Sequence, residues 1–411
     1  MSHVDPLNLS CGQTALYPAA LKALSCQLDA PIYYPPFPDV VVSCVGHIQS
    51  LMHTNNEILL ITGSAIYGEE AAMSTVLEPE DLCVTVNTGV FGQVLTDLVK
   101  TAGSNNGEIN IPPGKVVSVE EIRAALRNQP NAKMLALVHV ETTAGTSNPV
   151  ADIGVMMRRE FPDVLLMVDA VSSLGSLPLH VDEWNIDICC SSSQKCLNAP
   201  QGIAIVSISE RVWKVIEKRT SAIPGLCLDL MTWKKWHQSV RAERDSSQVD
   251  SSYTEYKCVH GPSGSYTLLN ALRASLEEIL REGESDVLKR HESAGKALRA
   301  GIRAMGLEVL AAEEDAAPCS TCVVMPGNQF DVQRYMQTVH RDYGIATAGG
   351  SAVVEKNGYA GSRVGLMGFV ARPDSVFRLL AAMEDVLPDF GINIMRGRAE
   401  AAAQTVYHKP A

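Results

Sequence analysis

Ser191 to Gly202 reads Ser-Ser-Ser-Gln-Lys-Cys-Leu-Asn-Ala-Pro-Gln-Gly, and this stretch decides the fold. The apolar run Ile186 to Cys190 leads into it, and the apolar run Ile203 to Ile208 leads out of it. Both runs are short and rich in Ile, Val and Cys, which predicts two buried strands. Lys195 therefore follows a strand end, inside a serine-rich turn. A partly desolvated lysine presents a neutral amine that forms imines; the alternative is an ordinary surface lysine in a polar loop.

The composition is that of a globular, acidic chain. Its 411 residues suggest two or three domains, and 46% hydrophobic against 19% charged residues excludes general disorder. The formal net charge of −12 argues against a nucleic-acid or anionic-membrane partner. No apolar stretch approaches the roughly 20 residues of a membrane span. Neither end of the sequence resembles a signal peptide or a typical peroxisomal address, so we expect a cytoplasmic protein, with a peroxisomal location left open.

The cysteines point to a reducing compartment. The chain has 11 of them, scattered and mostly within apolar runs, which predicts reduced, core-filling thiols. Cys319 and Cys322 form a C-x-x-C pair within a predicted strand. Because no second pair accompanies it, we expect no metal site, and zinc or redox chemistry is the alternative.

Strands and helices alternate through the first half of the chain. We expect strands at 58–62, 82–86, 134–140, 164–168 and 186–190, and helices at 40–52, 69–77, 90–100, 117–129 and 155–160. This alternation predicts an α/β fold with a mostly parallel, doubly wound sheet. Thr142, Asp169 and Lys195 each come after one of these strands. The carboxyl ends of parallel strands share one edge, where ligands bind, so these three side chains should converge there.

The second half of the chain has a different pattern. Lys234 to Gly264 is polar and is predicted to be a long irregular loop. Long helices at 266–282 and 287–305 precede a mixture of short strands and helices that predicts a smaller C-terminal α+β domain. We therefore expect an N-terminal arm over 1–20, a large domain over 21–264, a small domain over 265–391 and a tail over 392–411.

Side chains expected at the carboxyl edge have complementary chemistry. Lys195 can form an imine with an aldehyde, and Asp169 can hold a proton on a heteroaromatic nitrogen. Phe91 offers a flat face for a ring, and Thr142 can bind a phenolic oxygen. Each residue also has a structural alternative: Asp169 as a helix N-cap, Phe91 as part of the core and Thr142 as a turn cap.

A phosphate site is predicted beside these groups. Ser64 stands between a strand and a helix, where backbone N–H groups and the helix dipole favour an anion. Gln194 precedes the lysine and can bind the same anion. An amine, a carboxylate, a flat ring and a phosphate site together describe a pocket for pyridoxal 5′-phosphate.

Several motifs resemble one enzyme family. Val168 to Ser173, Val-Asp-Ala-Val-Ser-Ser, and Ser193 to Pro200, Ser-Gln-Lys-Cys-Leu-Asn-Ala-Pro, closely resemble segments of the fold-type I, class V aminotransferases. The alanine–glyoxylate, serine–pyruvate and pyridoxamine–pyruvate aminotransferases are the nearest branches. Further matches are Gly63-Ser64, Asn87 to Gly92, His139 to Thr142 and Ser362 to Gly368, and the resemblance covers about residues 8–390.

The resemblance implies a role for each matching residue. Lys195 would be the Schiff-base lysine and the acid and base of proton transfer. Arg363 would bind the substrate carboxylate as a two-pronged fork, with an ion pair to a nearby Glu as its alternative. Gly12 and Tyr34 would complete the substrate site. The implied cofactor contacts are Asp169 to the pyridine nitrogen, Phe91 and Val171 to the ring faces, Thr142 to the ring hydroxyl, and Ser64, Ala65, Ile66, Gln194, His260 and Ser263 around the phosphate.

The family also implies a homodimer with shared active sites. The loops at Tyr33-Tyr34 and at His260 to Ser263 would then reach the partner's site. Two departures concern the phosphate: Ile66 stands where the family often has Thr or His, and Gly261 precedes Pro262 where it usually has Thr, with Ser263 as a substitute. We therefore expect a thinner phosphate site than is usual in the family.

Three functions fit these residues. The first is transfer of an amino group from a small alanine- or serine-like amino acid to glyoxylate or pyruvate. The second is other chemistry on the same scaffold, by a lyase, decarboxylase, racemase or desulfurase, including one in a specialised biosynthetic pathway. Within the transferases, the pyridoxamine-specific branch is disfavoured, because it carries an acidic residue at the Ser64 position and an extra Arg near Gly350. The third is a non-catalytic binding protein, which the presence of Lys195 opposes.

Overall fold

The computed structural model describes residues 6–26, 36–245, 264–326, 330–350 and 360–408. Its main layer is a seven-stranded sheet in the order β2-β10-β9-β8-β5-β3-β4. The strands are β2 (Glu57–Thr62), β3 (Leu82–Asn87), β4 (Asn105–Asn110), β5 (Ala132–Val138), β8 (Leu165–Asp169), β9 (Ile188–Ser192) and β10 (Ile203–Ile208). Only β10 runs antiparallel to its neighbours in this sheet. The predicted mostly parallel sheet is confirmed, and the carboxyl ends of β2, β3, β5, β8 and β9 share one edge.

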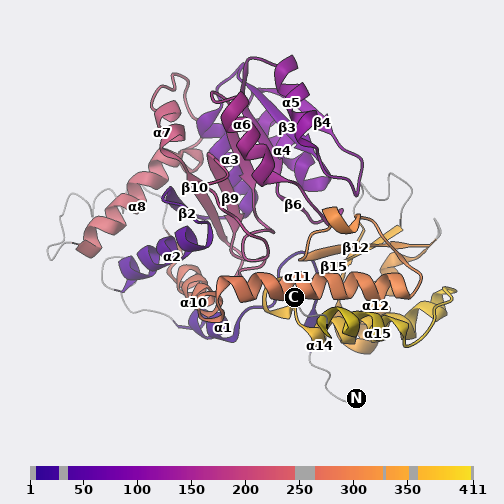
Figure 1. Cartoon of the computed structure of the whole chain (residues 1–411). Helices are drawn as coiled ribbons and strands as arrows, with labels where there is room; N and C mark the ends of the chain where they lie inside the picture. The colour runs from indigo at the N-terminus through magenta and orange to yellow at the C-terminus, as the bar shows by residue number, and fades with distance from the viewer. Residues whose placement is uncertain (1–5, 27–35, 246–263, 327–329, 351–359, 409–411) are drawn as a thin grey trace.

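Helices connect these strands, as the alternating pattern predicts. They are α2 (Phe37–Leu51), α3 (Ala65–Val76), α4 (Val90–Thr101), α5 (Val119–Asn128), α6 (Val150–Glu160), α7 (Glu210–Ile216) and α8 (Leu230–Asp245). Strands β8, β9 and β10 are buried along their whole length, which explains why their sequences are continuous apolar runs. Helix α3 packs on β9 and β10, and α4 packs on β3, so both helices begin at the carboxyl edge (Figure 1).

Helix α8 corrects the predicted loop over Lys234 to Gly264. It continues to Asp245, and the rest of the predicted loop lies outside the described residues except Gly264. Trp233, Trp236 and His237 are buried, and the ring Nε2 of His237 accepts the N–H of Leu60 at 2.8 Å. The many polar residues on the other side of this helix hid its buried face from the sequence analysis.

Strand β4 is an element that the sequence analysis missed. Its sequence, Asn-Asn-Gly-Glu-Ile-Asn, has no apolar run or alternation. It pairs in parallel with β3 at the edge of the sheet, and all of its residues are exposed or only partly buried. An edge position explains the polar sequence.

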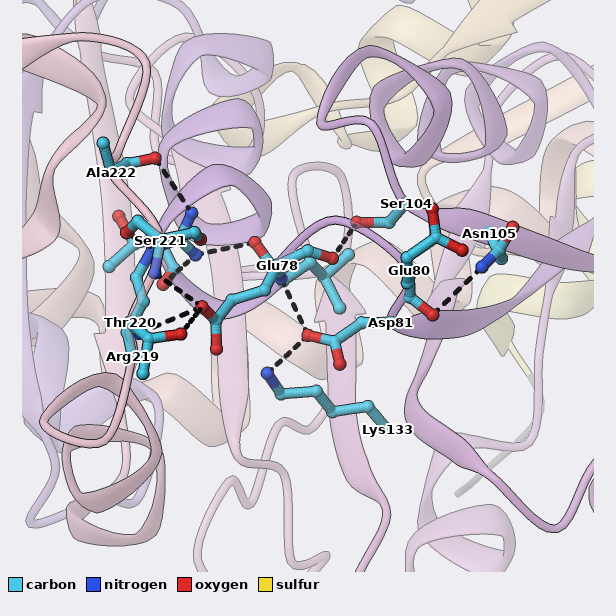
Figure 2. Close-up of polar contacts among 12 residues, drawn as sticks. Glu78, Glu80, Asp81, Ser104, Asn105, Lys133, Arg219, Thr220, Ser221 and Ala222 are labelled. Carbon is cyan, nitrogen blue, oxygen red and sulfur yellow. Dashed lines mark hydrogen bonds and ion pairs between the residues drawn. The ribbon is translucent and has the colours of Figure 1, made fainter.

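Polar contacts close the amino edge of the sheet. Glu78, after α3, accepts N–H groups of Thr220 at 3.0 Å and Ser221 at 2.8 Å, and these bonds lower the pKa of Glu78 to about 2. Asp81 accepts the N–H of Glu78 at 2.7 Å and pairs with Lys133 Nζ at 2.6 Å (Figure 2). Carboxylates at this edge are engaged by protein donors, which indicates a structural role.

The C-terminal part of the chain has its own sheet and core. The antiparallel sheet has the order β11-β12-β15-β14, formed by β11 (Glu308–Val309), β12 (Ser320–Met325), β14 (Ala348–Gly349) and β15 (Ala360–Gly365). It lies with α11 (Glu284–Ala304), α12 (Val332–Tyr343), α14 (Pro373–Val386) and α15 (Arg398–His408), below the large sheet in Figure 1. Helix α10 (Tyr266–Glu282) leads into it. The small α+β unit is confirmed, and its exact boundaries remain predictions.

The N-terminal segment contacts both parts of the molecule. Strand β1 (Leu7–Asn8) pairs in parallel with β13 (Ile345–Ala346). Further along, the Thr14 hydroxyl lies 3.0 Å from the carbonyl oxygens of Gln194 and Lys195, before α1 (Pro18–Leu24) begins. The predicted arm is therefore held against the lysine turn. Among the described residues, none of the helices has the length and apolar character needed to span a membrane.

Candidate active site

A small cavity lies at the carboxyl edge of the large sheet. The space between its lining atoms is about 300 Å³, which includes solvent at its mouth, and the lining residues are Ala65, Ile66, Glu69, Phe91, Val140, Asp169, Val171, Ser172 and Lys195. Six of these nine were predicted as site residues: Ala65, Ile66, Phe91, Asp169, Val171 and Lys195. A larger cleft beside α11 is lined by charged residues such as Lys289 and Glu292 and contains no predicted site residue.

Lys195 is buried at this cavity. Its side chain is only 7% exposed, and its Nζ donates a hydrogen bond to the carbonyl oxygen of Cys11 and lies 6.0 Å from the centre of the Phe91 ring. Burial lowers the pKa of Lys195, and the nearby Cys11, Cys196 and Asp169 oppose this shift without cancelling it. The surface-lysine alternative is therefore wrong, and the amine can be neutral.

Asp169 ends β8 and faces the same cavity. One of its carboxyl oxygens accepts the N–H of Val171 at 2.7 Å, and a turn follows, so Asp169 caps no helix. Burial raises the pKa of Asp169 to about 7; the Val171 N–H opposes this shift, the charge of Glu141 adds to it and the charge of Lys195 opposes it. A positive ring nitrogen placed here would favour the ionised carboxylate.

Phe91 is positioned by a residue that sequence reasoning missed. Glu141 lies in β6 (Val140–Glu141) and is fully buried. Its carboxylate accepts the N–H groups of Phe91 at 3.0 Å and Gly92 at 3.3 Å, and both the N–H and the hydroxyl of Thr143. It thus binds the free N–H groups at the start of α4, which fixes Phe91 beside the cavity. The sequence did contain a signal for Glu141: like Thr142, it follows a predicted strand, so it belongs to the same edge of the sheet.

Three of the predicted phosphate contacts, Ser64, Ala65 and Ile66, lie at the start of α3. Ser64 precedes the first turn, yet its hydroxyl makes no capping hydrogen bond to the helix. Ile66 is 42% exposed. Because its side chain is a hydrocarbon, only its backbone N–H can bind an anion. Gln194 is buried, and its Oε1 has no hydrogen-bond partner among the described residues. The N–H groups at the start of α3 and the Ser64 hydroxyl are donors of the kind that a phosphate needs, whereas Gln194 can meet a phosphate only through its Nε2 group, because Oε1 is an acceptor.

Thr142 is a second unsatisfied group, two residues after Val140, which lines the cavity. It is 1% exposed, and its Oγ1 has no partner within the described part of the chain, while its carbonyl oxygen accepts the Ser320 hydroxyl at 3.1 Å. A buried hydroxyl without a partner is costly in a protein interior. The orphaned Oγ1 of Thr142, the Asp169 carboxyl and the Lys195 amine together match the ring hydroxyl, the ring nitrogen and the aldehyde of pyridoxal 5′-phosphate.

Two of the three predicted substrate residues, Arg363 and Gly12, lie in described segments. Arg363, on β15, donates its Nε to the Gly349 carbonyl at 2.7 Å and has no carboxylate partner among the described residues, so the predicted ion pair is not seen there. Its positive charge acts on Cys11, whose carbonyl binds Lys195, and Gly12 follows in an exposed bend. The structure thus brings Arg363 and Gly12 to the lysine. Tyr34, His260 and Ser263 lie outside the described residues.

Comparison with known proteins places the chain in a family. Residues 41–242 match the family model described as aminotransferase class-V. The (S)-ureidoglycine–glyoxylate transaminase of Bacillus subtilis is 31% identical over 399 residues, which cover 96% of this chain and 94% of the relative. The chain belongs to the class-V aminotransferases. The members of this family depend on pyridoxal 5′-phosphate, so the resemblance and the cofactor predicted from the sequence are confirmed.

Solved structures agree with this assignment. The crystal structure of ureidoglycine–glyoxylate aminotransferase from Bacillus subtilis has a TM-score of 0.88 at 29% identity and matches over 100% of both chains. That of an alanine–glyoxylate aminotransferase from Nostoc sp. has a TM-score of 0.83 at 28% identity over 94% and 96% of the two chains. The pyridoxamine–pyruvate transaminase of Mesorhizobium japonicum is 28% identical over 406 residues, 98% and 97% of the two chains.

A buried asparagine holds the lysine turn of this aminotransferase in place. Asn198 has a positive φ of 52°, which non-glycine residues rarely adopt. Its Nδ2 donates to the carbonyl of Ala15 at 3.0 Å and of Met367 at 3.3 Å, and its Oδ1 accepts the Phe369 N–H at 2.8 Å. A Cβ on Gly368 would collide with Oδ1. Asn198 therefore ties the lysine turn to the N-terminal segment and to the small unit.

The cysteines of this aminotransferase do not form a metal centre in the described residues. All described cysteines are free, and no group of three or more metal-binding side chains occurs among them and the described His, Asp and Glu residues. Cys319 is buried and donates to the Ser172 carbonyl at 3.3 Å. A contact to Cys196, together with burial, raises the pKa of Cys319. The thiol is thus a packed interior group.

Proposed function

We propose that this aminotransferase moves an amino group from a small amino acid to a small 2-oxo acid, with glyoxylate and pyruvate as the acceptors. One observation carries the proposal: Lys195, Asp169 and Phe91 line a single buried cavity, and the charge of Arg363, which has no carboxylate partner among the described residues, acts on Cys11, whose carbonyl contacts Lys195. The names of the relatives above support these acceptors, since each contains glyoxylate or pyruvate.

The residues around the cavity would hold the cofactor in one orientation. Bound pyridoxal 5′-phosphate would supply the electron sink that lets the amino donor lose its Cα proton. Asp169 would keep a proton on the ring nitrogen, and Thr142 would bind the ring hydroxyl through its free Oγ1. Phe91 and Val171 would contact the ring faces, and Ser64, the N–H groups of Ala65 and Ile66, and Gln194 would hold the phosphate.

Lys195 would carry the proton during amino transfer. Its amine is desolvated, and the lowered pKa of Lys195 increases the fraction of neutral base at neutral pH. In that state Nζ would accept the Cα proton of the donor and return it to the cofactor carbon that carries the transferred amino group. In the second half-reaction the same path, reversed, would protonate the α-carbon of the amino acid formed from the acceptor. The hydrogen bond to the Cys11 carbonyl would orient Nζ toward the N-terminal segment, which precedes Gly12 of the proposed substrate site.

Arg363 would select substrates by their carboxylate. Its guanidinium is partly buried, its Nε binds the Gly349 carbonyl, and its other N–H groups have no partner within the part of the chain that the structure describes. A carboxylate bound by such a fork is held in a fixed plane. The enclosed cavity would favour small substituents on Cα.

We further propose a homodimer in which Tyr34, His260 and Ser263 complete the partner's site. The phosphate contacts within one chain are sparse, because Ile66 and Ala65 offer only backbone N–H groups. Contacts from a second chain would supply the missing donors. Size-exclusion chromatography with light scattering tests the assembly, and a monomer that binds the cofactor and turns over would contradict it.

Spectroscopy with amino donors tests the function. The protein reconstituted with pyridoxal 5′-phosphate should absorb between 300 and 500 nm, and L-alanine or L-serine should shift this absorbance toward that of the pyridoxamine form. Glyoxylate or pyruvate should then reverse the shift and yield glycine or alanine. Arg363→Gln should weaken both half-reactions through KM, and no shift with any common amino donor would refute the proposal.

A further inference from the structure

Glu69 is a buried acid that neither the sequence analysis nor the proposed function uses. It lies on α3, one turn after Ala65, and is only 3% exposed. Its carboxyl lines the same cavity as Asp169 and Lys195. It has no hydrogen-bond or ion-pair partner among the described residues. A buried carboxyl without donors is costly when ionised, so its position beside a ligand cavity calls for an explanation.

Asp169 and Glu69 differ in the donors available to them. Asp169 accepts the Val171 N–H at 2.7 Å, whereas no donor of the described residues contacts Glu69. A donor stabilises the ionised form, so Asp169 ionises first and Glu69 keeps its proton. In agreement, burial and the charge of Asp169 raise the pKa of Glu69 well above its ordinary range. The free protein thus contains a pair of buried carboxyls in which Asp169 is the first to lose its proton.

The other titratable groups near this pair leave Glu69 without a cation of its own. Cys190 and Cys189 on β9 lie beside the pair, and burial raises the pKa of both thiols, so they stay neutral. Glu141 on β6 acts on Asp169 and adds negative charge. Lys195 is the cation nearest Asp169 in the described part of the chain, and its Nζ is directed to the Cys11 carbonyl. A ligand that brings a positive charge would therefore act on the carboxyls of Asp169 and Glu69, which have no dedicated cation among the described residues.

We propose that Glu69 is a positioning residue for the cofactor: with Asp169 it forms a pair of buried carboxyls for the ring nitrogen, and the second carboxyl extends the pH range in which the protein holds the protonated ring. This inference rests on the proposed function, because it takes Asp169 as the partner of the ring nitrogen. Glu69 acts through the pair and touches no substrate in this proposal.

Charge linkage gives the direction of the effect. A protonated ring nitrogen favours the ionised form of Glu69, and by reciprocity an ionised Glu69 favours the proton on the ring nitrogen. At neutral pH Asp169 alone suffices and Glu69 stays neutral. At alkaline pH, where the ring would lose its proton, the second negative charge holds that proton in place. Glu69 should thus matter more as the pH rises.

The test is noncovalent cofactor binding at two pH values. The probe is 4′-deoxypyridoxine 5′-phosphate, which lacks the aldehyde and cannot react with Lys195. Its Kd is measured by equilibrium dialysis against the full-length, cofactor-free chain, for wild type and Glu69→Gln. The amide copies the shape of the neutral acid but cannot ionise. We expect equal Kd values near pH 6.5 and about tenfold weaker binding by Glu69→Gln near pH 9, as for a change of about one pKa unit on the ring nitrogen.

Controls separate this proposal from a packing role and from failure of the proposed function. Glu70→Gln removes the same charge from the next residue of α3, which does not line the cavity, and should bind like wild type at both pH values. Glu69→Leu should reproduce the pH-dependent loss if Glu69→Gln does not fold. A Kd ratio of variant to wild type that stays constant between the two pH values would overturn the role of Glu69. Failure of wild type to bind either the probe or pyridoxal 5′-phosphate would instead refute the proposed function.

Discussion

Glu141 and Asp169 are buried carboxyls at the ends of neighbouring segments, and the fold treats them differently. Glu141 receives four hydrogen bonds, from the start of α4 and from Thr143. Asp169 receives one, from Val171, and its remaining acceptor capacity faces a cavity. A carboxylate with a full set of protein donors is part of the scaffold, whereas one with an incomplete set marks the place of a ligand. The same contrast separates Thr143, which binds Glu141, from Thr142, whose hydroxyl has no partner.

The largest effect is expected on turnover, when the cavity that Asp169 faces loses the amine of Lys195. Lys195→Ala should lower turnover by roughly 10²–10⁴-fold, because the site loses its general acid and base. The melting temperature of the cofactor-free protein should not fall, since a buried amine with one hydrogen bond is removed. Steady-state kinetics and calorimetry measure the two. Lys133→Ala, which breaks the ion pair with Asp81 at the opposite edge, should show the reverse pattern; lost turnover in both variants would contradict this contrast.

The next largest effect is expected on stability, when the N–H groups bound by Glu141 lose their carboxylate. Glu141→Gln should lower the free energy of unfolding by about 2–4 kcal/mol, because N–H groups at the start of α4 lose their charged partner in a buried site. Urea denaturation measures the change. Glu121→Gln is the control, because it removes the carboxylate from the exposed capping box of α5. It should lower the free energy of unfolding by less than about 1 kcal/mol. Equal losses would show that burial of the Glu141 contacts has no energetic importance.

A smaller effect is expected from pH. The pKa of Asp169 is raised from 3.8 to about 7, so the folded protein keeps a proton that the unfolded chain loses between these values. The free energy of unfolding of the cofactor-free protein should therefore fall, by roughly 1–3 kcal/mol from this group, as the pH rises from about 4 to about 7. Asp169→Asn should remove this part of the pH dependence. Identical slopes in the two proteins would refute the raised pKa of Asp169.

The smallest effects on stability and cofactor binding are expected from Thr→Val substitutions at the adjacent residues Thr142 and Thr143. Thr143→Val should destabilise the protein by about 1 kcal/mol, since Glu141 loses a donor. Thr142→Val removes a hydroxyl without a partner and should leave the cofactor-free protein at least as stable. The cofactor Kd should change in the opposite order, with Thr142→Val weakening binding by about fivefold to tenfold. Thermal unfolding and equilibrium dialysis on both variants sharpen the comparison most directly.

Residues in the core of the sheet were predictable because their pattern is repetitive. Buried parallel strands are continuous apolar runs, and the polar residues that follow them must share an edge, so Asp169 and Lys195 could be brought together before any coordinates. Strand β4 and helix α8 could not be predicted in this way. The first is a polar edge strand, and the second carries three buried aromatic residues on an otherwise polar helix.

The two missed carboxyls have a common physical reason. Glu69 and Glu141 resemble surface residues in the sequence, because burial of a charged side chain depends on tertiary contacts that no local pattern specifies. A weak signal was nevertheless present for Glu69. It is four residues from Ala65 and three from Ala72, so it lies on the small-residue face with which α3 approaches the sheet. A charged residue on such a face marks a site in its own right.

The pairing of β1 with β13 has a consequence for synthesis of the chain. Leu7 leaves the ribosome near the beginning of translation, yet its strand partner, Ile345, is made only after four-fifths of the chain. The segment that supplies the Cys11 carbonyl to Lys195 therefore waits for the C-terminal unit before it can take its final place. The lysine turn is assembled last, so a nascent or truncated chain that lacks the C-terminal unit has the large sheet without a finished catalytic centre.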